Sequence, residues 1–238
     1  LYFFKNLCYN INIERNLIMT YNINEIKDLL SFFNPEHFTD EDVDFFIDEL
    51  NQQNCVPEFN WEAGATKCVI IPNNYDYVIK IPFDGEINYE ENEEGNFRYY
   101  YNGGGTEGWD YCELENEYWI DIIQHSDFSQ FFLCPESIDV GNWPVYIQPK
   151  IVPCNENIKE RYKSIDSVYK VRTESKMYNH TRLPDVWLAA CLENLEGDIE
   201  KLDEFIIFLK DNFSDLHEGN IGYLGNRAVI LDYAGFND

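Results

Sequence analysis

The sequence has little positive charge. Its 238 residues include 17 lysines and arginines against 44 aspartates and glutamates, which gives a formal net charge of −27. Such a surface repels nucleic-acid phosphates and anionic membranes, so we expect neither direct nucleic-acid binding nor a membrane partner. A basic protein suits this charge better as a partner. The simpler explanation is that the charge keeps a chain rich in phenylalanine and tyrosine soluble.

The sequence also lacks the patterns that mark export, membrane insertion or structural metal binding. It has no apolar run long enough to cross a bilayer and no leader-like opening, which predicts a cytoplasmic protein. Its cysteines never form a CxxC pair, and its histidines stand at no metal-ligand spacing, so neither a disulfide framework nor a structural zinc site is expected. The seven cysteines are Cys8, Cys55, Cys68, Cys112, Cys134, Cys154 and Cys191, and the four histidines are His37, His125, His180 and His217.

The hydrophobic content of 45% is sufficient for a substantial core, in one large domain or two closely packed lobes. Residues 1–18 lack a clear period or caps and are interpreted as a non-native or upstream-encoded segment. Residues 19–56 predict a helical extension, with one helix over 23–33 and a second that starts near Thr39. The apolar stripes of both helices are expected to pack into the core rather than bind a partner.

Residues 57–150 begin with short β-rich runs, in which 68–71 and 77–81 predict a hairpin. An acidic stretch with three consecutive glycines follows, and we expect a mobile loop over 84–109. A helix over 110–124 and strands near 137–140 and 144–148 complete this part. The remainder, 151–238, is predicted to be largely helical over 155–211.

Glu115 stands within the apolar face of the helix predicted over 110–124. An unpaired carboxylate away from water is unfavourable, so this residue is expected to have a cationic partner. Glu113 and Glu117 project from other faces and are less favoured for that role.

The most informative segment is Asp215-Leu-His-Glu-Gly-Asn220, followed by a predicted hairpin and by Asp232-Tyr-Ala-Gly235. This order resembles the protein-kinase-like superfamily, and the histidine after Asp-Leu resembles the catalytic loop of aminoglycoside and choline phosphotransferases. The resemblance implies an α+β, bilobal fold with an antiparallel β-sheet N-lobe and a reduced, mainly helical C-lobe. It also implies ATP and Mg²⁺ as cofactors.

By the same resemblance, Asp215 would orient or deprotonate the acceptor hydroxyl, and His217 would position Asp215 or contact the γ-phosphate. Asn220 and Asp232 would hold Mg²⁺. Phosphoryl transfer needs cations among the phosphates and a carboxylate beside the attacking hydroxyl, which is why these residue types matter.

Upstream residues meet the family's other requirements in the right order. The run Gly64-Ala-Thr66-Lys67 resembles a glycine-rich phosphate loop that retains one glycine, and Lys80 resembles the strand lysine that contacts the α- and β-phosphates. Lys80 would pair with Glu115, and Gln148 would lie in the hinge that binds adenine. Each signal alone has an ordinary structural explanation, whereas the ordered set favours nucleotide binding.

Two departures leave rival functions open. Phe213 and Ser214 replace the His-Arg of protein kinases, and only three residues follow Gly235, which leaves no room for an activation segment. A minimal, phage-like phosphotransferase acting on a protein or small-molecule hydroxyl is the first hypothesis. A nucleotide-binding pseudokinase is the second, and an acidic nucleic-acid mimic that occupies a basic protein is the third.

Overall fold

The N-terminal helices form the outermost layer of the structure, a computed structural model that describes residues 21–53, 58–64, 66–83, 88–91, 97–100, 108–154, 165–213 and 216–233. Helix α2 spans Ile23–Leu29, the 3₁₀ turn η1 spans Asp40–Asp42, and α3 spans Val43–Gln52. The predicted cap at Thr39 is confirmed, because its amide and hydroxyl both donate to Asp42 Oδ2 at 2.9 Å. This capping box starts the helix.

A five-stranded antiparallel sheet lies beneath these helices, with the strand order β1-β2-β3-β7-β6. Its strands are β1 (Phe59–Ala63), β2 (Lys67–Pro72), β3 (Tyr77–Pro82), β6 (Glu136–Val140) and β7 (Trp143–Pro149). Because side chains alternate between the faces of a strand, Ile70, Ile79 and Ile147 point toward α2 and α3. The opposite face therefore carries Lys67 and Lys80.

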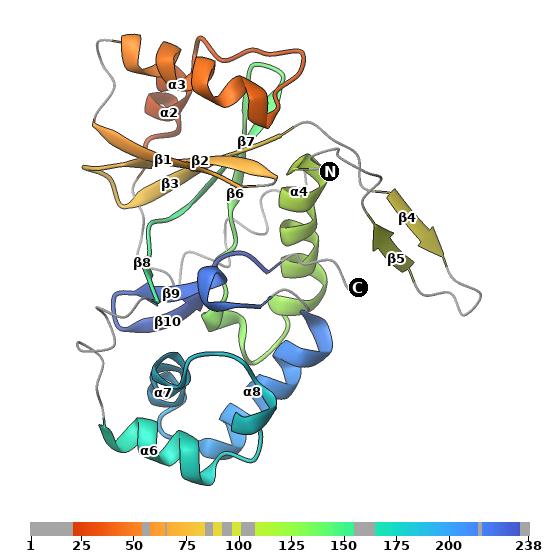
Figure 1. Ribbon diagram of the computed structural model, residues 1–238, viewed down its shortest axis with the longest axis vertical. Coiled ribbons are helices and arrows are strands. Elements are labelled where there is room, and N and C mark those ends of the chain that lie inside the picture. Colours follow the sequence, from red (N-terminus) through yellow and green to blue (C-terminus); the bar gives the residue numbers. More distant parts are fainter. Residues whose placement is uncertain are drawn as a thin grey trace.

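Helix α4 (Gly108–Tyr118) runs past the edge of the sheet toward the second half of the chain, as Figure 1 shows. It continues as a π-helical turn, η2 (Trp119–Ile123), and a 3₁₀ turn, η3 (Ser129–Phe131), follows. The predicted helix over 110–124 is thus present. Its Glu115 is completely buried, whereas Glu113 and Glu117 are exposed, as the periodicity predicted.

The expectation of a mobile loop over 84–109 is wrong for its two regular segments. Strand β4 (Asn88–Glu91) pairs antiparallel with β5 (Phe97–Tyr100), with Tyr89 opposite Tyr99. Tyrosine and phenylalanine favour strands, so the aromatic content of these two segments was a better guide than the acidic composition on which the prediction rested. The other residues of that stretch before Gly108 lie outside the described residues.

The second half of the chain is mainly helical, as predicted. It contains α6 (Ile165–Glu174), η4 (Tyr178–His180), α7 (Asp185–Asn194) and α8 (Ile199–Asn212). The 3₁₀ turn η5 (Glu218–Asn220) leads into the predicted hairpin of β9 (Ile221–Leu224) and β10 (Arg227–Ile230). A short strand that the sequence did not predict, β8 (Val152–Pro153), joins this hairpin at β9.

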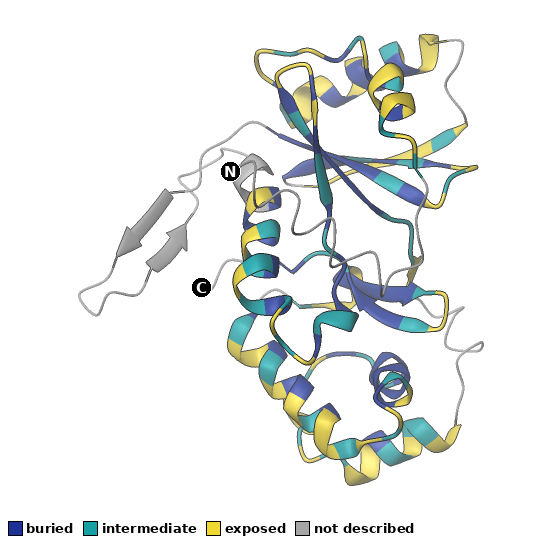
Figure 2. Cartoon of the chain, turned by 180° about the vertical axis from the view of Figure 1, so that it is seen from behind, coloured by how far each residue is buried: buried dark blue, intermediate teal, exposed yellow. Residues whose placement is uncertain are grey.

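Burial separates the structure into two hydrophobic cores, which appear as the dark blue regions of Figure 2. One contains the inner residues of α2, α3 and the five-stranded sheet. The other contains α7, α8, the β9–β10 hairpin and the π-helical turn, with Trp187 and Phe205 fully buried. The predicted α+β class, with an antiparallel sheet in the first half and helices in the second, is confirmed.

Gly222 explains how β8 and β9 approach so closely. A Cβ atom at this position would lie 2.4 Å from Ile151 Cδ1 and 2.5 Å from the carbonyl oxygen of Val152. Only glycine therefore allows the chain that leaves β7 to pair alongside the hairpin here. This contact fixes the hairpin, and with it the segment that contains Asp232, beneath the sheet.

Two findings concern membrane-spanning helices and disulfides. None of the described helices is long and apolar enough to span a membrane. Within the described part of the chain, none of the five cysteines forms a disulfide.

Candidate functional site

Lys80 lies at the centre of a buried charged cluster on the lower face of the sheet. Its ammonium is 3.5 Å from Glu115 Oε2 and donates a hydrogen bond of 3.1 Å to the carbonyl oxygen of Leu231. Both side chains are almost fully buried, with 2% and 0% of the lysine and glutamate exposed. The predicted ion pair is therefore present, and Lys80 also ties β3 to the residue before Asp232.

Lys67, which the sequence predicts to lie beside the phosphates, belongs to the same cluster, but its pairing with Asp232 was not predicted. Its ammonium is 2.9 Å from Asp232 Oδ1 and 3.6 Å from Glu115 Oε1. The shorter distance is a charge-assisted hydrogen bond, whereas the longer one is an electrostatic contact only. The partners in the first pair are 165 positions apart in the chain, so the fold brings them together.

Leu231 is the backbone connection that holds this arrangement. Its carbonyl oxygen accepts from both Lys80 Nζ and Gln148 Nε2 at 3.1 Å, and its amide donates to the carbonyl oxygen of Asn220 at 3.0 Å. A second bond from Gln148 Nε2, of 2.8 Å, reaches the carbonyl oxygen of Leu133. The Gln148 side chain thus anchors β7 to the hairpin. No sequence motif indicated this, because the acceptors are backbone atoms.

The loop before β9 has a local order that explains its glycine. The amide of Gly219 donates to His217 Nδ1 at 3.0 Å, which caps η5. A Cβ atom on Gly219 would lie 2.8 Å from the same imidazole ring, so glycine permits the cap. Because Nδ1 accepts, the ring proton of neutral His217 is on Nε2. Asp215 lies outside the described residues.

The turn before β2, which the sequence predicts as a phosphate loop, is held by backbone hydrogen bonds. Gly64 donates from its amide to the carbonyl oxygen of Lys67 at 2.9 Å, which closes the turn. Thr66 is buried, and its carbonyl oxygen accepts from the amide of Phe83 at 2.9 Å. Gly64 is exposed, and a Cβ atom there would be no nearer than 3.9 Å to another group.

Burial and mutual proximity shift the protonation of the cluster. Burial raises the pKa of Glu115 to about 8, although Lys80 and Lys67 oppose the shift and Asp232 adds to it. Burial also acts on Asp232, but Lys67, hydrogen bonding with Glu115, and Lys80 hold its pKa below the usual range. Burial opposes the charge of Lys67 as well, yet Asp232 and Glu115 raise its pKa well above the ordinary lysine value. Burial and the neighbouring charges thus act in opposite directions on each of these three groups.

The shifted Glu115 pKa predicts a pH-dependent stability. Since its pKa is higher in the folded state, the folded protein binds more protons than the unfolded chain between the ordinary glutamate pKa and about pH 8. The free energy of unfolding should therefore fall as pH rises through this range, by about 1.4 kcal/mol per pH unit at most.

Thermal melts of the wild type and Glu115→Gln between pH 5 and pH 9 measure this effect. Glutamine keeps the shape of the protonated acid and does not titrate, so the wild type should lose Tm relative to the variant as pH rises. A wild type that gains Tm relative to Glu115→Gln over the same range would show that Glu115 is ionised in the folded protein.

The donor types beside Lys67 suit a magnesium ion. Mg²⁺ prefers oxygen ligands, and it usually binds one or two carboxylates together with substrate phosphates. Asp232 and the buried amide of Asn220 supply such oxygens, and the bond from Leu231 to Asn220 connects their backbones. Among the described residues, no group of three or more His, Cys, Asp and Glu side chains could hold a metal ion. The protein residues described therefore fit a metal that arrives with phosphate oxygens.

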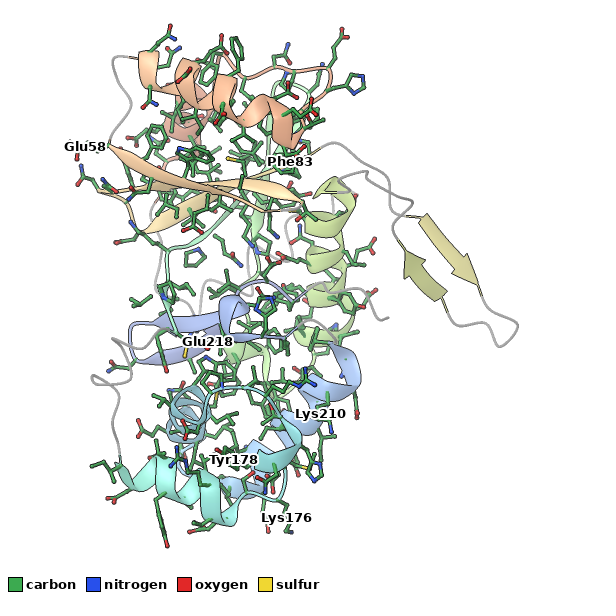
Figure 3. The ribbon with its side chains drawn as sticks, viewed as in Figure 1. Glu58, Phe83, Lys176, Tyr178, Lys210 and Glu218 are labelled. Atoms are coloured by element: carbon green, nitrogen blue, oxygen red, sulfur yellow. The ribbon has the colours of Figure 1, made fainter. Side chains whose placement is uncertain are left out.

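Access to the cluster differs among its members. The Asp232 side chain is 21% exposed, against 8% for Lys67 and 2% for Lys80. Phosphate oxygens or a metal ion would therefore reach the cluster from the Asp232 side. Glu218 marks the neighbouring η5 turn in Figure 3, where it lies below the sheet. A separate hollow of about 470 Å³ lies between α2 and the β6–β7 turn, and none of the predicted site residues lines it.

Comparisons with known proteins give a weak structural likeness. No family model matches the chain, and no curated protein does. Two solved aminoglycoside phosphotransferases are similar, both at 13% identity over 81% of this chain and 71% of theirs. One is APH(2″)-IIa in a ternary complex with streptomycin and ATP, with a TM-score of 0.31, and the other is ADP-bound APH(2″)-Ib, with a TM-score of 0.30.

Proposed function

We propose that the protein is an ATP- and Mg²⁺-dependent phosphotransferase. The observation that supports this most is the contact of Lys80 with both Glu115 and the carbonyl oxygen of Leu231, directly before Asp232. A strand lysine held in this way presents a fixed positive charge to the phosphates of a nucleotide. The order of the other motifs along the chain supports the same function.

Each residue of the cluster has a role in this proposal. Lys80 orients the α- and β-phosphates, and Glu115 holds Lys80 in place. Asp232 and Asn220 hold Mg²⁺, which neutralises charge on the transferring phosphoryl group when it is bound. Lys67 and the turn from Gly64 to Thr66 lie on the phosphate side.

The base would lie against the lower face of the sheet. Val69 stands opposite Lys80 in the paired strand, Val78 precedes Lys80 by two residues, and both valines are half-buried. Their apolar side chains suit the flat surface of adenine, and the hinge after Gln148 offers backbone groups to its edge. The acceptor hydroxyl, on a protein or a small molecule, would be activated by Asp215.

Nucleotide-dependent thermal stabilisation tests this proposal. At about 100 times its Kd, Mg-ATP should stabilise the folded wild type by about 2.7 kcal/mol, which raises Tm by roughly 5–10 °C. Asp232→Asn should lose the part of this shift that requires Mg²⁺, because the amide is a poorer ligand. Each protein is compared with its own ligand-free melt.

Asp211→Asn is the matched control, because Asp211 is an exposed carboxylate at the end of α8. It should retain the full shift. A wild type that Mg-ATP fails to stabilise would remove the basis for nucleotide binding. An equal shift in Asp232→Asn would remove Asp232 from the metal site.

A further inference from the structure

The pairing of Lys67 with Asp232 is the feature of the cluster that neither the sequence nor the family pattern predicts. A phosphate-binding lysine would be expected to face solvent, but Lys67 is buried and its ammonium is on Asp232 Oδ1 at 2.9 Å. An ammonium at this distance occupies the space on that oxygen in which a cation would bind. Asp232 is also the most accessible carboxylate of the cluster.

The charges around Lys67 affect how the cluster would bind a divalent cation or a polyphosphate. Lys67 faces Asp232 at 2.9 Å and Lys80 faces Glu115 at 3.5 Å, so each carboxylate of the cluster already has an ammonium beside it. A divalent cation that approaches alone therefore meets a principal ligand that is already paired. A polyphosphate meets the opposite situation, because both ammonium groups attract it.

We propose that Lys67 is an internal cation that competes with the divalent metal for Asp232, so that metal binds tightly only together with the nucleotide. This inference rests on the proposed function, since it assigns the metal to Asp232. The nucleotide phosphates compensate the charge of Lys67 and draw its ammonium from Asp232 Oδ1, which leaves this oxygen to the metal. Metal and nucleotide binding are thereby coupled, and the coupling is reciprocal.

Lys67 is suited to this exchange by its place in the fold. It is the first residue of β2 and follows the turn that the Gly64 amide closes, so its long side chain can move while the strand stays paired. Lys80 is different, because it lies within β3 and bonds to the carbonyl oxygen of Leu231. The two lysines therefore differ in role, since Lys80 is fixed and Lys67 is exchangeable.

Metal binding in the absence of nucleotide tests this directly. Mn²⁺, which accepts the same oxygen ligands as Mg²⁺, is titrated into the protein and its free concentration is read by electron paramagnetic resonance. Lys67→Met should bind Mn²⁺ at least about tenfold more tightly than the wild type, which corresponds to a coupling of the size usual between sites. Lys67→Arg retains the charge and should bind as weakly as the wild type.

A second titration with a non-hydrolysable ATP analogue completes the experiment. Because the phosphates then occupy Lys67 in the wild type, the Mn²⁺ affinities of the wild type and Lys67→Met should differ by less than about threefold. Adding Asp232→Asn to Lys67→Met should abolish the gain that the single substitution produced. Thermal melts of all variants verify that they are folded.

Equal Mn²⁺ affinities of the wild type and Lys67→Met without nucleotide would overturn the inference, as would a gain in Lys67→Arg that equals the gain in Lys67→Met. Failure of the proposed function has a different signature, because then the ATP analogue binds to none of the proteins. The nucleotide-free Mn²⁺ titration remains informative in that case, since it requires only the pairing of Lys67 with Asp232.

Discussion

Replacement of Asp215 with asparagine should lower the rate of phosphoryl transfer by about 10²–10⁴-fold, the usual contribution of a positioned general base. The residue precedes Asn220 by five positions, the spacing at which the resemblance to phosphotransferases assigns it to the acceptor hydroxyl. Asparagine keeps the size of the side chain and removes its ability to accept a proton. Binding of Mg-ATP should persist, because Lys80 and Asp232 are unchanged.

Transfer of label from γ-labelled ATP, to candidate acceptors or to water, measures this effect. Glu218→Gln is the matched control, because Glu218 is an exposed carboxylate three residues further along the same loop, with no role in the proposed mechanism. It should keep turnover within about twofold of the wild type, as expected for a surface position. A wild type that binds Mg-ATP but turns over no faster than Asp215→Asn would identify a nucleotide-binding module without catalysis.

The parts of the site that could be predicted from the sequence are those in which a residue type conflicts with its local pattern. Glu115 is such a case, since a carboxylate on the apolar face of a helix needs a cation, and periodicity separated it from Glu113 and Glu117. The order of motifs then suggested Lys80 as that cation. Both residues lie in one cluster, although their sequence separation alone indicates nothing about contact.

The remaining features depend on contacts that leave no trace in side-chain patterns. The Leu231 carbonyl oxygen, which accepts from Lys80 and Gln148, is a backbone group that any residue would provide. The pairing of Lys67 with Asp232 depends on how the hairpin lies beneath the sheet. That position in turn depends on the absence of a side chain at Gly222, a requirement visible only once β8 is seen to pair beside it.

The N-terminal helices illustrate the same distinction. The apolar stripes of α2 and α3 predicted packing, but not the surface on which they pack. In the structure these helices cover the face of the sheet opposite to Lys67 and Lys80 (Figure 1), and they share its hydrophobic core. Aromatic and aliphatic residues of the helical segment meet there with residues of the strands, among them Trp143.

Replacement of Phe38 with alanine should therefore destabilise the protein by about 3–5 kcal/mol, the usual loss for a buried phenylalanine. Phe38 is 2% exposed, and its ring lies 5.0 Å from that of Phe33, 5.5 Å from Phe46 and 5.6 Å from Phe83, between centroids. The last contact matters most, because Phe83 directly follows β3, the strand that contains Lys80. A cavity at Phe38 would therefore weaken the packing that holds β3, and with it Lys80, in position.

Denaturant unfolding measures this loss, and Phe45→Ala provides the control. Phe45 lies in α3 one residue before Phe46, but it is 68% exposed, so its truncation should change stability by no more than about 0.5 kcal/mol. If the helices and the sheet form one cooperative unit, Phe38→Ala should also lower the concentration of denaturant at which Mg-ATP binding is lost. A Phe38→Ala protein as stable as Phe45→Ala would show instead that the helices contribute no folding energy to the sheet. The face of the sheet that carries Lys67 and Lys80 would then have to be held by α4 and the β9–β10 hairpin alone.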